Sequence, residues 1–65
     1  MMKEAATIVF QDADSAVEVV AIVRYDASRV ALCLSLKSNG DLEVVMMKAE
    51  ARALIESLKK AVDEK

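Results

Sequence analysis

Apolar and polar residues alternate along most of the chain and then change to a helical period. Four runs show the two-residue alternation and the Val, Ile and Leu content that are typical of strands. From residue 48 the apolar positions recur at spacings of three and four, which predicts an amphipathic helix. We therefore predict one α+β domain over residues 1–65, a four-stranded antiparallel meander followed by a C-terminal helix. The predicted strands cover residues 5–10, 17–25, 29–37 and 41–47, and the helix covers 48–63.

The registers of the two outer hairpins follow from keeping apolar residues opposite apolar residues. A slip of one residue would move every side chain to the other face of the sheet. A three-residue loop, Ser38-Asn39-Gly40, pairs Leu36 with Leu42 and places its glycine in the left-handed conformation that closes such a loop. The first hairpin is expected to pair Phe10 with Val17. The same two registers also pair Leu34 with Val44, Lys37 with Asp41, and Ile8 with Val19.

The middle hairpin is predicted from charge as well as from alternation. A two-residue turn would set Arg24 directly opposite Arg29, and like charges in that position are destabilising. A four-residue loop over 26–29 avoids this pair and sets Tyr25 opposite Val30. The same register pairs Val23 with Leu32, Ala21 with Leu34, and Glu18 with Lys37.

These registers make one face of the sheet apolar from end to end, and the helix is expected to cover that face. The apolar stripe of the helix begins at the end of the last strand, and its opposite side is charged. Salt-bridge spacing of four residues, as between Arg52 and Glu56, suits a solvated side. The stripe consists of Met47, Ala51, Leu54, Ile55, Leu58, Ala61 and Val62.

The second face of the sheet is predicted to be polar at one end and apolar at the other. One expected row across the strands holds Ala5, Ile22, Cys33 and Val45. An antiparallel sheet with one wet face normally alternates cleanly, so this patch needs a cover, and the chain has no second helix to supply it. We expect self-association, in which two copies either stack these faces or pair their edge strands into a continuous sheet. The predicted homodimer interface is Val20, Ile22, Cys33, Val45 and Met47.

The size of the chain favours self-association for an independent reason. A domain of 65 residues hides only about 60% of the surface of its unfolded chain, so its own core is small. Cys33 is the only cysteine, which excludes an internal disulfide, and the absence of histidine removes the usual zinc ligands. Packing and oligomerisation remain as sources of stability.

Composition points away from enzymes, membranes and strongly basic partners. Catalysis by a serine or cysteine nucleophile needs a neighbouring base, and the chain has no histidine. No metal or cofactor is expected, since the Asp12-Ala13-Asp14 segment lacks the other ligands of a calcium loop. No apolar run approaches the roughly 20 residues of a membrane helix, and the first residues lack the order of a signal peptide. We therefore expect a cytoplasmic, non-enzymatic protein.

Two other functions remain open beside the homodimeric interaction module. The topology is similar to that of dimeric proteins that bind single-stranded nucleic acid, and the basic contacts would then be Arg24, Arg29 and Lys37. Against this, the net charge is -2, and both aromatic residues, Phe10 and Tyr25, fall on the face assigned to the core. The other alternative is an oligomer that encloses a pocket for a small ligand, or a surface that binds a different protein.

Overall fold

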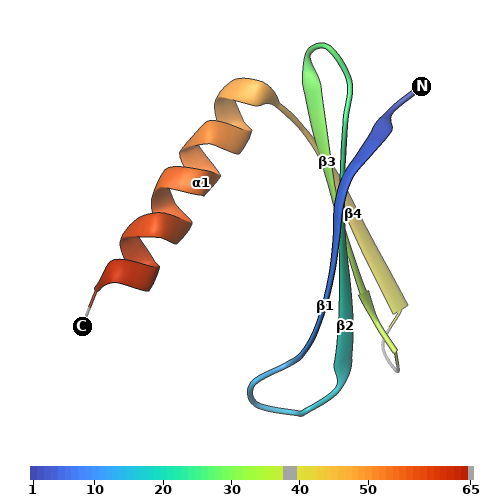
Figure 1. The fold of residues 1–65 in the computed structure, drawn as a ribbon, viewed down its shortest axis with the longest axis vertical. Helices are drawn as coiled ribbons and strands as arrows, with labels where there is room; N and C mark the ends of the chain where they lie inside the picture. The colour runs from blue at the N-terminus through green and yellow to red at the C-terminus, as the bar shows by residue number, and fades with distance from the viewer. Residues whose placement is uncertain (38–39, 65) are drawn as a thin grey trace.

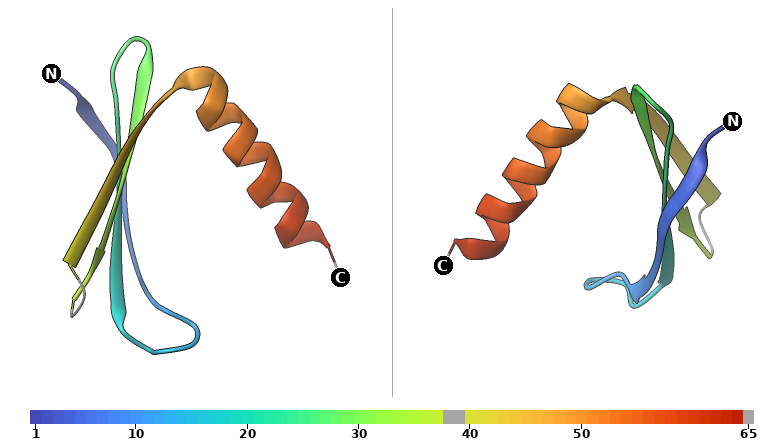
Figure 2. Two further views of the ribbon diagram at one scale, coloured as in Figure 1. Left: turned by 180° about the vertical axis from the view of Figure 1, so that it is seen from behind. Right: turned by 45° about the horizontal axis from the view of Figure 1, so that its top comes forward.

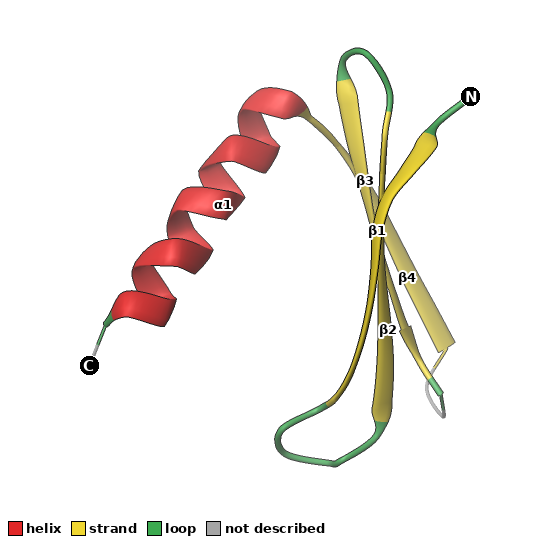
Figure 3. Cartoon of the chain, viewed as in Figure 1, coloured by secondary structure: helices red, strands yellow, loops and turns green. Residues whose placement is uncertain are grey.

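The computed structural model describes residues 1–37 and 40–64. Four strands precede one helix along the chain (Figure 1). The strands form one antiparallel sheet in the order β1-β2-β3-β4, so the predicted α+β meander is confirmed (Figure 3). Predicted and observed ends agree within two residues. The elements are β1 (Lys3–Gln11), β2 (Glu18–Tyr25), β3 (Arg29–Leu36), β4 (Gly40–Met47) and α1 (Lys48–Asp63).

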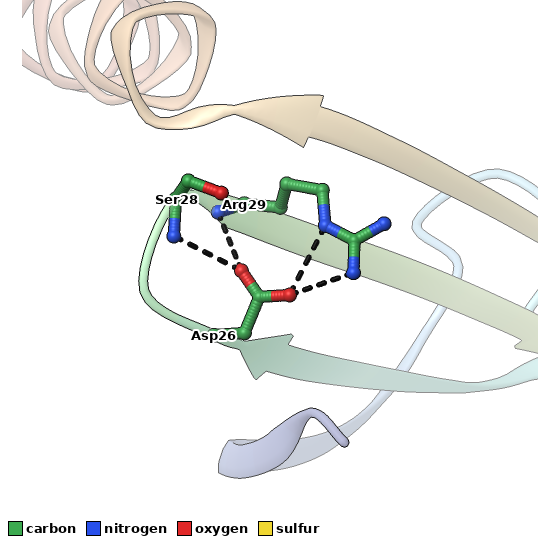
Figure 4. A network of polar contacts seen from close by, with 3 residues as sticks. All are labelled: Asp26, Ser28 and Arg29. Carbon is green, nitrogen blue, oxygen red and sulfur yellow. Dashed lines mark hydrogen bonds and ion pairs between the residues drawn. The ribbon is translucent and has the colours of Figure 1, made fainter.

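The middle hairpin has the predicted register, with Tyr25 opposite Val30. Asp26 holds the loop together, because its carboxylate accepts hydrogen bonds from the backbone N–H groups of Ser28 and Arg29 at 3.0 and 2.8 Å (Figure 4). Its second oxygen accepts from Nε and Nη2 of Arg29 at 3.0 and 2.7 Å. The Arg29 guanidinium, helped by these backbone donors, lowers the pKa of Asp26 to about 2.

The register of β3 against β4 differs from the prediction by two residues. Leu36 lies opposite Gly40 and Leu34 lies opposite Leu42, so the predicted Leu36–Leu42 and Lys37–Asp41 pairs are wrong. Alternation did not exclude this register, because a shift of two residues leaves every side chain on its own face. The positive φ of Gly40, 85°, is confirmed. Ser38 and Asn39, the rest of the predicted loop, lie outside the described residues.

The register of β1 against β2 is also displaced by two residues, and the loop explains why. Phe10 pairs with Val19 rather than Val17, and Ile8 with Ala21 rather than Val19. The Asp12 N–H donates to the carbonyl of Val17 at 2.8 Å, so the ladder continues past Gln11. The Asp12 carboxylate accepts from both the N–H and the hydroxyl of Ser15 at 2.9 Å, which lowers the pKa of Asp12. Because Asp12 is bonded to Val17, only residues 13–16 lie between the last paired residues, whereas the predicted Phe10–Val17 pair would leave residues 11–16.

The helix begins as predicted but leaves the sheet instead of covering it. The Met47 N–H donates to the Glu50 carboxylate at 3.0 Å, and the Lys48 N–H donates to the Ser28 carbonyl at 3.3 Å. Beyond this attachment the axis of α1 diverges from the strands, and the two elements form an open V (Figure 2). The expectation that the helix stripe covers the apolar face is therefore wrong. The spacing of apolar residues along the helix shows that the stripe needs an apolar surface to pack against. It does not show in which direction the helix leaves the sheet, which is set by the first turn.

Candidate functional site

An open apolar groove of about 350 Å³ lies between the sheet and residues 51–58 of α1. Apart from Ala5, both walls are built from side chains that the sequence pattern assigned to the core. A β-bulge between Glu4 and Ala6 shifts the register of β1, and Ala5 lines the groove instead of lying on the second face as predicted. The sheet supplies Ala5, Val23, Tyr25, Val30, Leu32 and Met46, and the helix supplies Ala51, Leu54, Ile55 and Leu58.

The apolar face of the sheet continues past the groove towards the end farther from α1. There the registers place Ile8, Ala21, Leu34 and Leu42 in one row. The edge members Ile8 and Leu42 are more than half exposed, whereas the central Ala21 is buried. The following row contains Phe10, Val19 and Leu36. The prediction that this face is apolar from end to end is confirmed, although nothing among the described residues covers its outer strands.

The exposure of the helix stripe increases along α1. Ala51 is 9% exposed, Leu54 38%, Ile55 61%, Leu58 57% and Val62 81%. Ala51 is the only buried residue of the helix, whose whole length is described. The stripe is therefore in contact with its own sheet at the first turn and is increasingly surrounded by solvent towards the C-terminus.

The overall dimensions show how much surface this opening leaves uncovered. The radius of gyration is 13.0 Å, whereas a compact chain of this length has about 11 Å. The accessible surface is 5275 Å², against about 4,100 Å² for a compact monomer of 7.1 kDa. The excess is roughly 1,200 Å². None of the described large apolar side chains is fully buried.

The residues predicted for the dimer interface lie on the second face, which is more polar than expected. Val20, Ile22 and Cys33 are half-buried there, and Val45 and Met47 are exposed. The observed register separates Val45 from Cys33, because Cys33 lies opposite Glu43 and Val45 lies opposite Ala31. Ile22 and Cys33 are paired as expected, but Val45 is not in their row, so that part of the prediction is wrong.

Polar contacts also cross the second face. The Arg24 guanidinium reaches from β2 to the Glu43 carboxylate on β4 at 3.5 Å, above the intervening β3. The Ser35 hydroxyl donates to the Asp41 carboxylate at 2.5 Å. Ala31, which lies between Arg24 and Val45, is 1% exposed. Side chains of this chain therefore already cover part of the patch that appeared to need a partner.

The three basic residues considered for nucleic-acid contacts do not gather in one place. Arg24 pairs with Glu43, and Arg29 pairs with Asp26 at 2.7 Å. Lys37 lies beside Glu18 at the opposite end of β2, and the six steps along the strand from Glu18 to Arg24 span roughly 20 Å.

Within 1–37 and 40–64, no group of three or more His, Cys, Asp or Glu side chains is placed to hold a metal ion. In that part of the chain, α1 is neither long nor apolar enough to cross a membrane.

The comparisons with known proteins add no family to these observations. Among models of protein families, curated proteins and solved structures, none matches this chain. The groove and the uncovered apolar face are therefore the features from which a function is inferred.

Proposed function

We propose that this chain is a non-enzymatic interaction module that acts as a homodimer, in which a second copy covers the groove and the apolar face. The observation that carries the proposal is the uncovered face itself, which extends from the groove to Ile8 and Leu42 at the outer strands. Contiguous exposed apolar surfaces of this kind mark interaction sites. The interface therefore lies on the helix side of the sheet, and not on the second face that the sequence pattern favoured.

The size of the uncovered surface supports a second copy as the occupant. Covering the excess of roughly 1,200 Å² on each of two chains buries about 2,400 Å², which falls in the range of permanent homodimers. Two apolar surfaces, the sheet face and the helix stripe, are exposed on the same chain. A two-fold dimer uses the same patch on both subunits. One interface can therefore cover the sheet face and the helix stripe of both chains.

Light scattering on two matched variants of β4 tests the proposal. Leu42 and Val45 are 60% and 50% exposed, and they point to opposite faces of the sheet. We expect the wild type at micromolar concentration to have twice the 7.1 kDa chain mass. Leu42→Glu places a charge in the proposed interface and is expected to give monomers, whereas Val45→Glu is expected to remain dimeric. A monomeric wild type, or a dimer lost only in Val45→Glu, contradicts the proposal.

Native mass spectrometry of the wild type distinguishes the other functions considered. The groove volume of about 350 Å³ is within the range of small-ligand pockets. If the wild type is a monomer that retains a small molecule, its function is ligand binding and not dimerisation.

The nucleic-acid alternative is tested by titration with single-stranded DNA. The wild type is compared with a variant that lacks the charges of Arg24 and Arg29. If both proteins bind the DNA with the same salt dependence, those two residues are not nucleic-acid contacts.

A further inference from the structure

We propose that the dimer forms by reciprocal exchange of helices, with the C-terminal half of α1 in each chain packed on the apolar sheet face of its partner. This inference rests on the proposed homodimer and adds which segment fills the uncovered face. The segment carries Leu58 and Val62, the exposed part of the stripe in this half of the helix. Its receiving surface is the row of Ile8, Ala21, Leu34 and Leu42 together with the neighbouring open end of the groove.

The first turn of α1 fixes the helix in a direction that takes it away from its own sheet. The Lys48 N–H is hydrogen-bonded to the Ser28 carbonyl at 3.3 Å, and the Lys48 ammonium lies 6.0 Å from the centre of the Tyr25 ring. Ala51, one turn later, is already packed against the sheet. Folding the helix down onto its own strands would require this attachment to change.

The length of the helix shows that its divergence is not caused by a lack of reach. Sixteen residues of α-helix span roughly 24 Å. The eight residues of β3 span roughly 26 Å. The helix is therefore long enough to cover the strands, yet its second half leaves Ile8 and Leu42 in solvent. An element of matching length and apolarity is needed there, and the α1 of a second copy has both.

The distribution of charge on α1 favours helix exchange over direct stacking of two sheets. Its polar side is exposed, and it carries a single apolar stripe. Docking this stripe on a partner sheet leaves the polar side in water, as a one-sided amphipathic helix requires. Stacking the two sheets alone would leave Leu58 and Val62 uncovered. The polar side consists of Arg52, Glu56, Lys59, Lys60 and Asp63.

Cross-linking between differently labelled chains tests the exchange. In a Cys33→Ala background, one chain carries Val62→Cys and the other carries Ile8→Cys. The two chains are unfolded, mixed and refolded together, and a short bis-maleimide joins cysteines that lie close to each other. The matched control replaces Ile8→Cys by Val9→Cys, whose side chain is similarly exposed but points to the second face. Circular dichroism and light scattering verify that each mixture is folded and dimeric.

The exchange predicts a covalent 8–62 heterodimer of about twice the chain mass, and loss of this product with the Val9→Cys control. A mixture that is dimeric but gives no 8–62 product, or as much product with Val9→Cys, overturns the exchange and leaves the homodimer standing. A mixture that is monomeric in light scattering overturns both. The two proposals therefore fail in different ways.

Discussion

Truncation of Leu58 to alanine is expected to weaken the dimer without weakening the helix. Leu58 is 57% exposed in the single chain, so somewhat more than half of its side-chain surface is available to a partner. Complete burial of a leucine side chain stabilises by about 1.5–3 kcal/mol, so the remaining part is worth roughly 1–1.5 kcal/mol. Alanine has the higher helix propensity, so the loss arises from packing and not from the helix.

Two-fold symmetry doubles this loss, because the substitution is present in both chains. The free energy of dissociation should fall by about 2–3 kcal/mol, which raises the dimer Kd about 30- to 150-fold. Sedimentation equilibrium over a range of chain concentrations measures this Kd directly. At equal chain concentration the unfolding temperature of the variant should also be lower than that of the wild type, because partner binding stabilises the folded state less.

Lys59→Ala is the matched control for this measurement. Lys59 follows Leu58 directly, lies on the polar side of α1, and is also replaced by the best helix former. Its effect on the Kd should stay below about fivefold, as for surface substitutions in general. Equal effects of the two substitutions, or an unchanged Kd in Leu58→Ala, would refute burial of the stripe in the dimer.

Three further predictions concern the sheet and its loops. The pKa of Asp26 is about 2 in the folded protein, against an ordinary value of 3.8. The ionised carboxylate therefore stabilises the fold above about pH 4, and this contribution is lost as the pH falls towards 2. The free energy of unfolding in urea should therefore depend less on pH between about 4 and 2 in Asp26→Asn than in the wild type. Gly40→Ala should cost about 1–2 kcal/mol in urea unfolding because φ is 85°, although a Cβ meets no atom within 4 Å, and Gly40→Asn should cost less. Arg24 and Glu43 are 42% and 49% exposed, so a double-mutant cycle should give a coupling below about 1 kcal/mol that decreases in high salt.

The elements and their faces could be predicted from the sequence because they depend on local periodicity. Period-two runs gave the four strands, and the change of period gave the helix start at residue 48. The register of the middle hairpin was also predictable, since the like charges of Arg24 and Arg29 excluded its closest competitor. In the first hairpin the competing register differed by two residues and kept every face, so the loop bonds of Asp12 decided between the two registers.

The candidate site is less accessible to such reasoning. All of the groove residues in α1 were identified as one apolar stripe, and the face opposite them was identified as apolar. The pattern gave no signal that the two surfaces stay apart. The Arg24–Glu43 pair across β3 could have indicated that the second face is polar. The sequence suggests this pair only if the register of β3 against β4 is known.

By itself, then, the sequence determined which residues avoid water and on which side of each element they lie, because side-chain direction follows from the backbone period. Tertiary structure decided which apolar surfaces meet. The bond from Lys48 to Ser28 and the packing of Ala51 set the direction of α1, and this direction separates the stripe from the sheet. An apolar stripe specifies the need for a cover but not the chain that supplies it, since burial is non-directional.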